Sequence, residues 1–117
     1  MIDIVTIRQG DTYPPLRAYL QMANGKPIRL AGATVKLIAL DSNDNIKIER
    51  QVEIKDANKG YVEYIWDKED TQEPGELRAE FEITQQDGSI VTVPNDGYFI
   101  INITKQLGGY YEATTIV

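Results

Sequence analysis

The chain has 117 residues and a net charge of −6, and it contains neither cysteine nor histidine. Without cysteine there are no disulfides or thiolate ligands, and without histidine the usual general base and the commonest metal ligand are missing. An acidic surface repels phosphate backbones, so we expect no nucleic-acid partner. No stretch approaches the roughly 20 apolar residues of a membrane helix, so we expect no membrane partner. Met1 is followed by Ile-Asp-Ile-Val rather than by a signal peptide, so we expect synthesis in a cytoplasm.

Apolar side chains recur at every second position through most of the sequence, which is the period of half-buried β-strands. The clearest run is 77–84, where apolar residues alternate with Arg78, Glu80 and Glu82. Residues 67–72 form the one weak helical candidate, and they are too few for more than a turn. In chain order, the sequence predicts strands over residues 2–7, 16–22, 35–39, 46–54, 61–66, 77–84 and 99–103.

Turn signals separate these runs at short distances. Asn24-Gly25 and Asp87-Gly88 supply the positive φ that tight hairpins need. Closely spaced strands with little helix between them indicate a sandwich or a barrel. The composition changes only near the C-terminus, so we expect one β domain over residues 1–105 and a tail or linker over residues 106–117.

Two acidic segments carry the kinds of side chain that calcium sites and some hydrolases use. The first, residues 41–45, begins like a calcium loop. Ile46 stands where that loop needs Gly and Val52 where it needs Glu, so we favour a polar hairpin turn. The second is expected to be a solvated acidic turn, with a small hydrolase as the alternative; it contains Asp67, Glu69, Asp70 and Glu73. We therefore predict no catalytic residue, metal or cofactor.

Three aromatic residues, Tyr61, Tyr64 and Trp66, lie close together in the sequence. An exposed aromatic strip would suit sugar stacking, so a carbohydrate-binding β-sandwich module is an alternative function that would use these three residues. A tryptophan in a small sandwich is more often at the centre of the core, and we favour this placement for Trp66.

Five segments, taken in order, carry a resemblance to a known phage module. They are Gly10-Asp11-Thr12, residues 24–35 with the pattern G-x-P-I-x-L-x-G-A-T-V, residues 56–64, residues 71–82, and residues 87–103. Together they resemble the N-terminal domain of the phage baseplate upper protein (BppU) family, over residues 2–104.

The resemblance implies an all-β fold, an immunoglobulin-like antiparallel β-sandwich, in the tail tip of a phage or prophage of Gram-positive bacteria. It implies a structural protein that docks peripheral or receptor-binding parts to the tail hub. The implied partners are other tail and baseplate proteins, with a homo-oligomer in the assembled particle. The implied location is the virion baseplate, after synthesis in the cytoplasm of the bacterial host. The family has no catalytic residues to carry over.

Docking of this kind needs exposed surfaces, and both ends of the chain are apolar and β-prone. Such segments favour strand addition at a sheet edge. We therefore predict partner contacts in the N-terminal strand, residues 2–7, and in the tail, residues 110–117. The residues chosen are Ile2, Ile4, Tyr110, Tyr111 and Ile116.

Overall fold

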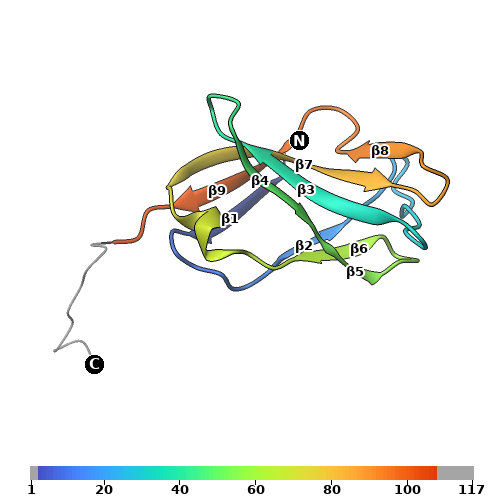
Figure 1. Cartoon of the computed structure of the whole chain (residues 1–117), viewed down its shortest axis with the longest axis horizontal. Helices are drawn as coiled ribbons and strands as arrows, with labels where there is room; N and C mark the ends of the chain where they lie inside the picture. The colour runs from blue at the N-terminus through green and yellow to red at the C-terminus, as the bar shows by residue number, and fades with distance from the viewer. Residues whose placement is uncertain (1–2, 108–117) are drawn as a thin grey trace.

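The computed structural model describes residues 3–107, which form two β-sheets stacked face to face (Figure 1). The all-β sandwich predicted from the two-residue period is confirmed. In the part of the chain that the structure describes, no helix has the length and apolar character of a membrane span. The elements are β1 (Ile4–Arg8), β2 (Leu16–Tyr19), β3 (Thr34–Leu40), β4 (Ile46–Gln51), β5 (Glu53–Asp56), β6 (Tyr61–Tyr64), the 3-10 turn η1 (Lys68–Thr71), β7 (Gly75–Thr84), β8 (Ile90–Val93) and β9 (Phe99–Thr104).

The larger sheet has six strands in the order β1-β9-β7-β3-β4, with β8 also paired to β7. β7 lies at its centre and pairs antiparallel with β3 along one side. Along its other side β7 pairs with β9 and β8 in succession, since Leu77 lies opposite Ile101 and Ile83 lies opposite Val91. β8 and β9 therefore occupy opposite ends of β7, as Figure 1 shows.

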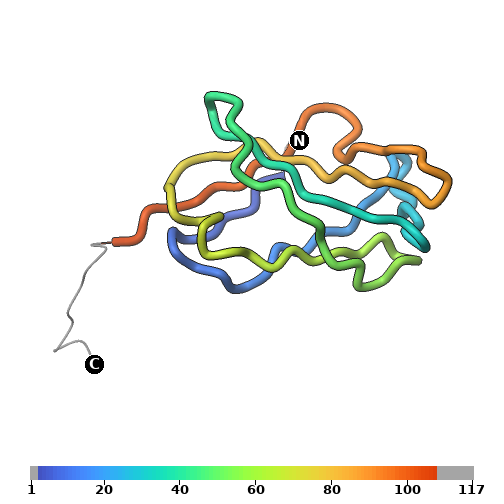
Figure 2. The backbone as a smooth tube through the Cα atoms, in the orientation of Figure 1, coloured from blue at the N-terminus to red at the C-terminus, as the bar shows by residue number. Residues whose placement is uncertain are grey.

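The smaller sheet has the order β2-β6-β5. The chain passes from the larger sheet to the smaller one at Val52, between β4 and β5, and the tube in Figure 2 follows this path. Val52 is buried, and its N–H donates to the carbonyl oxygen of Val35 at 2.9 Å. Consecutive strands thus belong to different sheets at this point, which ties the two layers together.

The core lies between the sheets and is built from alternate residues of the strands. Every second residue of β7 from 77 to 83 is buried, as the alternation predicts. The rings of Phe81 and Phe99 stack with their centroids 5.3 Å apart. Trp66 is 4% exposed, and its indole N–H donates to the carbonyl oxygen of Pro14 at 2.9 Å. The core placement favoured for Trp66 is therefore confirmed.

Three features of the strands differ from the predictions. β1 runs parallel to β9, because the whole intervening chain serves as the long crossover that a parallel pair needs. β2 ends at Tyr19: Leu20 bonds to the carbonyl of Gly60, the chain turns back, and Met22 is left 58% exposed. β8 was not among the predicted strands. The immunoglobulin-like subtype of the sandwich stays a prediction.

Candidate docking surfaces

Strand β1 forms one edge of the larger sheet, since among residues 3–107 it pairs with β9 alone. Ile4, one of the residues predicted to contact a partner, lies at its start with 61% of its surface exposed. The strand reads Ile-Val-Thr-Ile-Arg, so Arg8 supplies its single charge. An exposed and mainly apolar edge strand can accept a strand from another chain. Ile2 lies outside the described residues.

A hollow of about 390 Å³ opens beside this edge, between β1 and β2. Ile4 and Val5 line it on one side and Ala18 on the other, while the stacked rings of Phe81 and Phe99 reach it from the core. The edge of β1 therefore adjoins apolar side chains of both sheets. An added segment would bury apolar surface there as well as pair with the backbone.

A second edge is formed by β8, which pairs with β7 within the described residues. Beside it lies a hollow of about 610 Å³, lined mainly by side chains from residues 21–29 on one side and residues 91–93 on the other. We call this hollow the β8 groove. Met22 and Val91 both line it and are both exposed, at 58% and 39%. The groove is a consequence of the early end of β2, which lets residues 21–27 turn away from the sheet.

The acidic segment 67–73 is only partly the solvated turn that the sequence predicts. It forms the single 3-10 turn η1, as expected for so few residues, with the Asp67 carboxylate accepting from the N–H of Glu69. Asp70, however, is buried: its carboxylate accepts from the hydroxyl of Tyr64 at 2.5 Å and from the N–H of Asp67 at 2.8 Å. The expectation for Asp70 was wrong, because a tyrosine from β6 supplies a donor that no local pattern reveals.

Two titratable groups near this turn have shifted pKa values. The N–H of Glu69, and next the Arg50 guanidinium 2.8 Å away, lower the pKa of Asp67. Burial, and next the bond to Asp70, raise the pKa of Tyr64. Asp67 is therefore held ionised and Tyr64 is held neutral. The bond between Tyr64 and Asp70 anchors η1 to β6, and the ion pair of Asp67 with Arg50 ties the start of η1 to β4.

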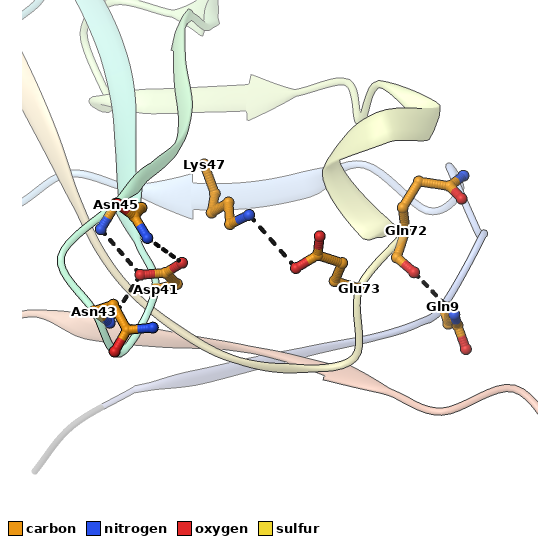
Figure 3. A network of polar contacts seen from close by, with 7 residues as sticks. All are labelled: Gln9, Asp41, Asn43, Asn45, Lys47, Gln72 and Glu73. Atoms are coloured by element: carbon orange, nitrogen blue, oxygen red, sulfur yellow. Dashed lines mark hydrogen bonds and ion pairs between the residues drawn. The ribbon is translucent and has the colours of Figure 1, made fainter.

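A hollow of about 500 Å³ lies between the turn at Asp41 and the acidic segment 67–73. Asp41 lines it on one side and Glu73, from the acidic segment, on the other (Figure 3). Asp41 accepts from the N–H groups of Asn43 and Asn45, and the N–H of Asn45 is the main cause of its lowered pKa. Glu73 is paired with Lys47 at 3.4 Å. Asp41 and Glu73 thus both have structural partners, and residues 41–45 form the polar turn between β3 and β4 that the sequence predicts. Among residues 3–107, no three acidic side chains gather as a metal site.

The aromatic residues proposed for sugar stacking do not share one exposed surface. Tyr64 and Trp66 are 2% and 4% exposed and pack edge to face in the core, with ring centroids 5.5 Å apart. Tyr61 is half-buried and lies on the other face of β6, where it pairs with the ring of Tyr19 at 4.7 Å. The tail residues Tyr110, Tyr111 and Ile116 lie outside the described residues.

The β8 groove is the surface that the sequence patterns did not predict. Residues 90–93, Ile-Val-Thr-Val, lack the alternation used to find strands, and Pro94 follows at once. A signal was present nonetheless. Asp87-Gly88 is a hairpin turn directly after the alternation of β7, and a β-branched run after such a turn is the natural second strand.

Fold and surfaces together define a small β-sandwich domain that has two exposed, mainly apolar strand edges within residues 3–107. The chain belongs to the family of BppU N-terminal domains, whose model matches residues 1–108. Membership supports a structural role in a phage baseplate, a place in the tail of the virion, and other baseplate proteins as partners. It also argues for a structural protein rather than an enzyme.

Two solved structures share the fold of this chain. The N-terminal domain of phage TP901-1 ORF48 is similar with a TM-score of 0.62 and 22% identity, over 87% of this chain and 85% of that chain. CopC from Methylosinus trichosporium OB3b is similar with a TM-score of 0.55 and 13% identity, over 92% of this chain and 90% of that one. At these identities the likeness shows the fold alone. No curated protein matches the chain in sequence.

Proposed function

We propose that this chain is a structural part of a phage tail baseplate that docks peripheral or receptor-binding parts to the tail hub. The docking uses protein–protein contacts, and several copies of the chain are repeated in the assembled particle. The observation that carries the proposal is the open edge of β1 in a member of the BppU N-terminal domain family.

The edge of β1 differs from that of β4 on the far side of the same sheet. β4 carries Lys47, Glu49 and Arg50, and all three form ion pairs with other elements. Charged side chains along an edge oppose the addition of another strand. β1 has one charge and the exposed Ile4, and it adjoins the hollow between β1 and β2. It is therefore the better docking edge of the two.

The test uses the phage or prophage that encodes the chain, with the gene deleted and supplied in trans. Tails purified from the complemented strain should contain the chain, and tails from the deletion should lack peripheral baseplate parts in negative-stain electron micrographs. Purified tails from which the chain is absent would overturn the baseplate role.

A matched pair of variants tests the β1 edge. Ile4→Lys places a charge on β1, and Ile46→Lys places the same charge on β4, where the isoleucine is equally exposed at 60% against 61%. We expect Ile4→Lys to lower the amount of chain recovered in purified tails at least tenfold, while Ile46→Lys leaves it unchanged. Equal recovery of Ile4→Lys and the wild type would show that β1 is not part of the docking surface, and would leave the proposed baseplate role unaffected.

A further inference from the structure

The outer edge of β8 pairs with no other strand among residues 3–107. In its antiparallel pair with β7, Gln85 donates to the carbonyl oxygen of Ser89 at the hairpin turn, so by alternation the backbone groups of Ile90 and Thr92 point away from β7. All four residues of β8 are uncharged and β-branched. Of the devices that usually protect an edge, β8 has only its shortness and Pro94 at its end.

The β8 groove lies where the side chains of an added strand would go. Val91 and Val93 lie opposite Ile83 and Phe81 of β7, which are core residues, so these two valines face the groove side of the sheet. A strand added next to β8 continues the sheet, and every second side chain would point into the same space. A volume of about 610 Å³ leaves room for several such side chains.

Two cations stand at the rim of the groove in a chain whose net charge is −6. Lys26 and Arg29 both line it, and neither forms an ion pair with any residue in the described range 3–107. An apolar groove with a cationic rim is complementary to an extended apolar segment that carries a carboxylate.

We propose that the β8 groove binds residues 110–117 of a second copy of this chain as an added strand. The segment reads Tyr-Tyr-Glu-Ala-Thr-Thr-Ile-Val, so it is β-prone and apolar, and Glu112 supplies a carboxylate for the rim. This contact is separate from docking by β1, and a negative result for one surface does not affect the other. Its affinity comes from backbone pairing along β8, and its selectivity from the side chains that enter the groove.

The donor must be another copy because of where the chain leaves the sandwich. β9 ends beside Gly75, at the opposite end of β7 from the pair formed by Thr84 and Ile90 (Figure 1). The ten residues of β7 span about 30 Å at roughly 3.3 Å per residue. Residues 108–110 reach at most about 11 Å beyond the end of the described chain. Residues 110–117 therefore cannot lie alongside β8 of their own copy.

Pairing of β8 with β8 of a second copy fits the groove less well. In that arrangement Lys26 and Arg29 of both copies would approach one another, and like charges oppose association. Val91 would keep facing its own groove rather than fill the neighbour's. Binding of the tail is instead head to tail, which links copies into a ring or an open chain.

The experiment measures molar mass by light scattering on the full 117-residue chain, with two proline variants. Thr92→Pro removes an N–H that points away from β7, a position where an edge strand tolerates proline, so the fold should survive while strand addition is blocked. Ala113→Pro places the same block in the tail. We expect the wild type to form species larger than a monomer, and each variant to be monomeric. An equimolar mixture of the two should form a 1:1 dimer, because one variant keeps the tail and the other keeps β8.

Each other result overturns the proposal. A wild type that stays monomeric up to its solubility limit leaves the groove to a different protein. An Ala113→Pro variant that keeps the wild-type mass indicates pairing between β8 strands, and monomers that do not combine on mixing exclude the head-to-tail contact. If circular dichroism shows that Thr92→Pro is unfolded, the double variant Lys26→Glu and Arg29→Glu takes its place. This variant leaves the backbone intact and should lower the association constant several-fold, and an unchanged constant would again refute the contact.

Discussion

Replacing Tyr64 by Phe removes the hydroxyl that bonds to the buried Asp70 and leaves the ring in place. The hydroxyl donates to the Asp70 carboxylate at 2.5 Å, and Tyr64 and Asp70 are 2% and 7% exposed. In the variant the same carboxylate oxygen keeps only the N–H of Asp67, at 2.8 Å. The packing of the ring against Trp66 is retained, so the variant isolates the hydrogen bond.

The magnitude follows from the charge and burial of the acceptor. A hydrogen bond to a charged group contributes about 1.5–3 kcal/mol, and solvent cannot replace a donor lost this far inside the sandwich. We therefore expect the free energy of unfolding to fall by about 2 kcal/mol, measured by urea denaturation with the fluorescence of Trp66 as the signal. A loss below about 0.5 kcal/mol would refute the view that the bond between Tyr64 and Asp70 anchors η1.

A matched control lies on the same strand. Tyr61 also donates to a carboxylate, that of Glu63 at 2.6 Å, but both side chains are half-buried on the outer face of β6. Tyr61→Phe should change the stability little, because water replaces the lost partner. Equal effects of the two substitutions would mean that burial does not set the value of these bonds.

The pH dependence of stability offers a second measurement on the same residue. Burial raises the pKa of Tyr64, and the bond to Asp70 raises it further. A tyrosine with a higher pKa in the folded than in the unfolded state contributes stability that is complete below about pH 10 and declines as the pH rises beyond it. The wild type should therefore lose stability in alkali more steeply than Tyr64→Phe. Parallel alkaline profiles of the two proteins would contradict this.

Three further predictions concern the fold. Gly60→Ala should lower the melting temperature more than Gly25→Ala. Both residues have positive φ, but an added Cβ at Gly60 would lie 2.5 Å from the carbonyl oxygen of Leu20, whereas Gly25 faces open space. Equal effects would show that only the positive φ matters. Trp66 should emit at short wavelength and resist quenching by iodide, whereas red-shifted, quenchable emission would restore the sugar-stacking surface. The pKa of Asp67 is lowered chiefly by the N–H of Glu69, so Asp67 stabilises the folded state above about pH 4 and this stabilisation is lost as the pH falls. Asp67→Ala should therefore make the loss of stability in acid less steep. An unchanged loss in acid would contradict the capping role of Asp67.

The period-two alternation predicted the strands that have one face in the core. In β7 the pattern is unbroken over residues 77–84, and the structure buries the expected residues. The parallel pairing of β1 with β9 could not be read from either segment, because alternation specifies which face is buried but not which strand lies alongside. β8 escaped because four β-branched residues show no alternation at all.

The surfaces were harder to predict than the strands because they depend on tertiary contacts. The β8 groove forms because two segments that are far apart in the sequence face one another in the fold, residues 21–29 and residues 91–93. The burial of Asp70 depends likewise on a hydroxyl from β6. Ile4 was chosen as a partner contact because it lies in a terminal, apolar and β-prone strand. It is exposed in the structure, its contact with a partner stays a prediction, and nothing local indicates the hollow beside it.

The parallel arrangement of the first and last strands has a mechanical consequence. Ile4 pairs with Ile100 and Arg8 with Thr104, so tension applied between the start of β1 and the end of β9 pulls the two strands past one another lengthwise. All the backbone hydrogen bonds between β1 and β9 then resist the load at the same time, instead of breaking one after another. A domain anchored through these two ends should therefore yield only at high force in a single-molecule pulling experiment. If the load is instead applied between the turn at Gly88 and the end of β9, the hydrogen bonds between β7 and β8 should break one after another, at a much lower force.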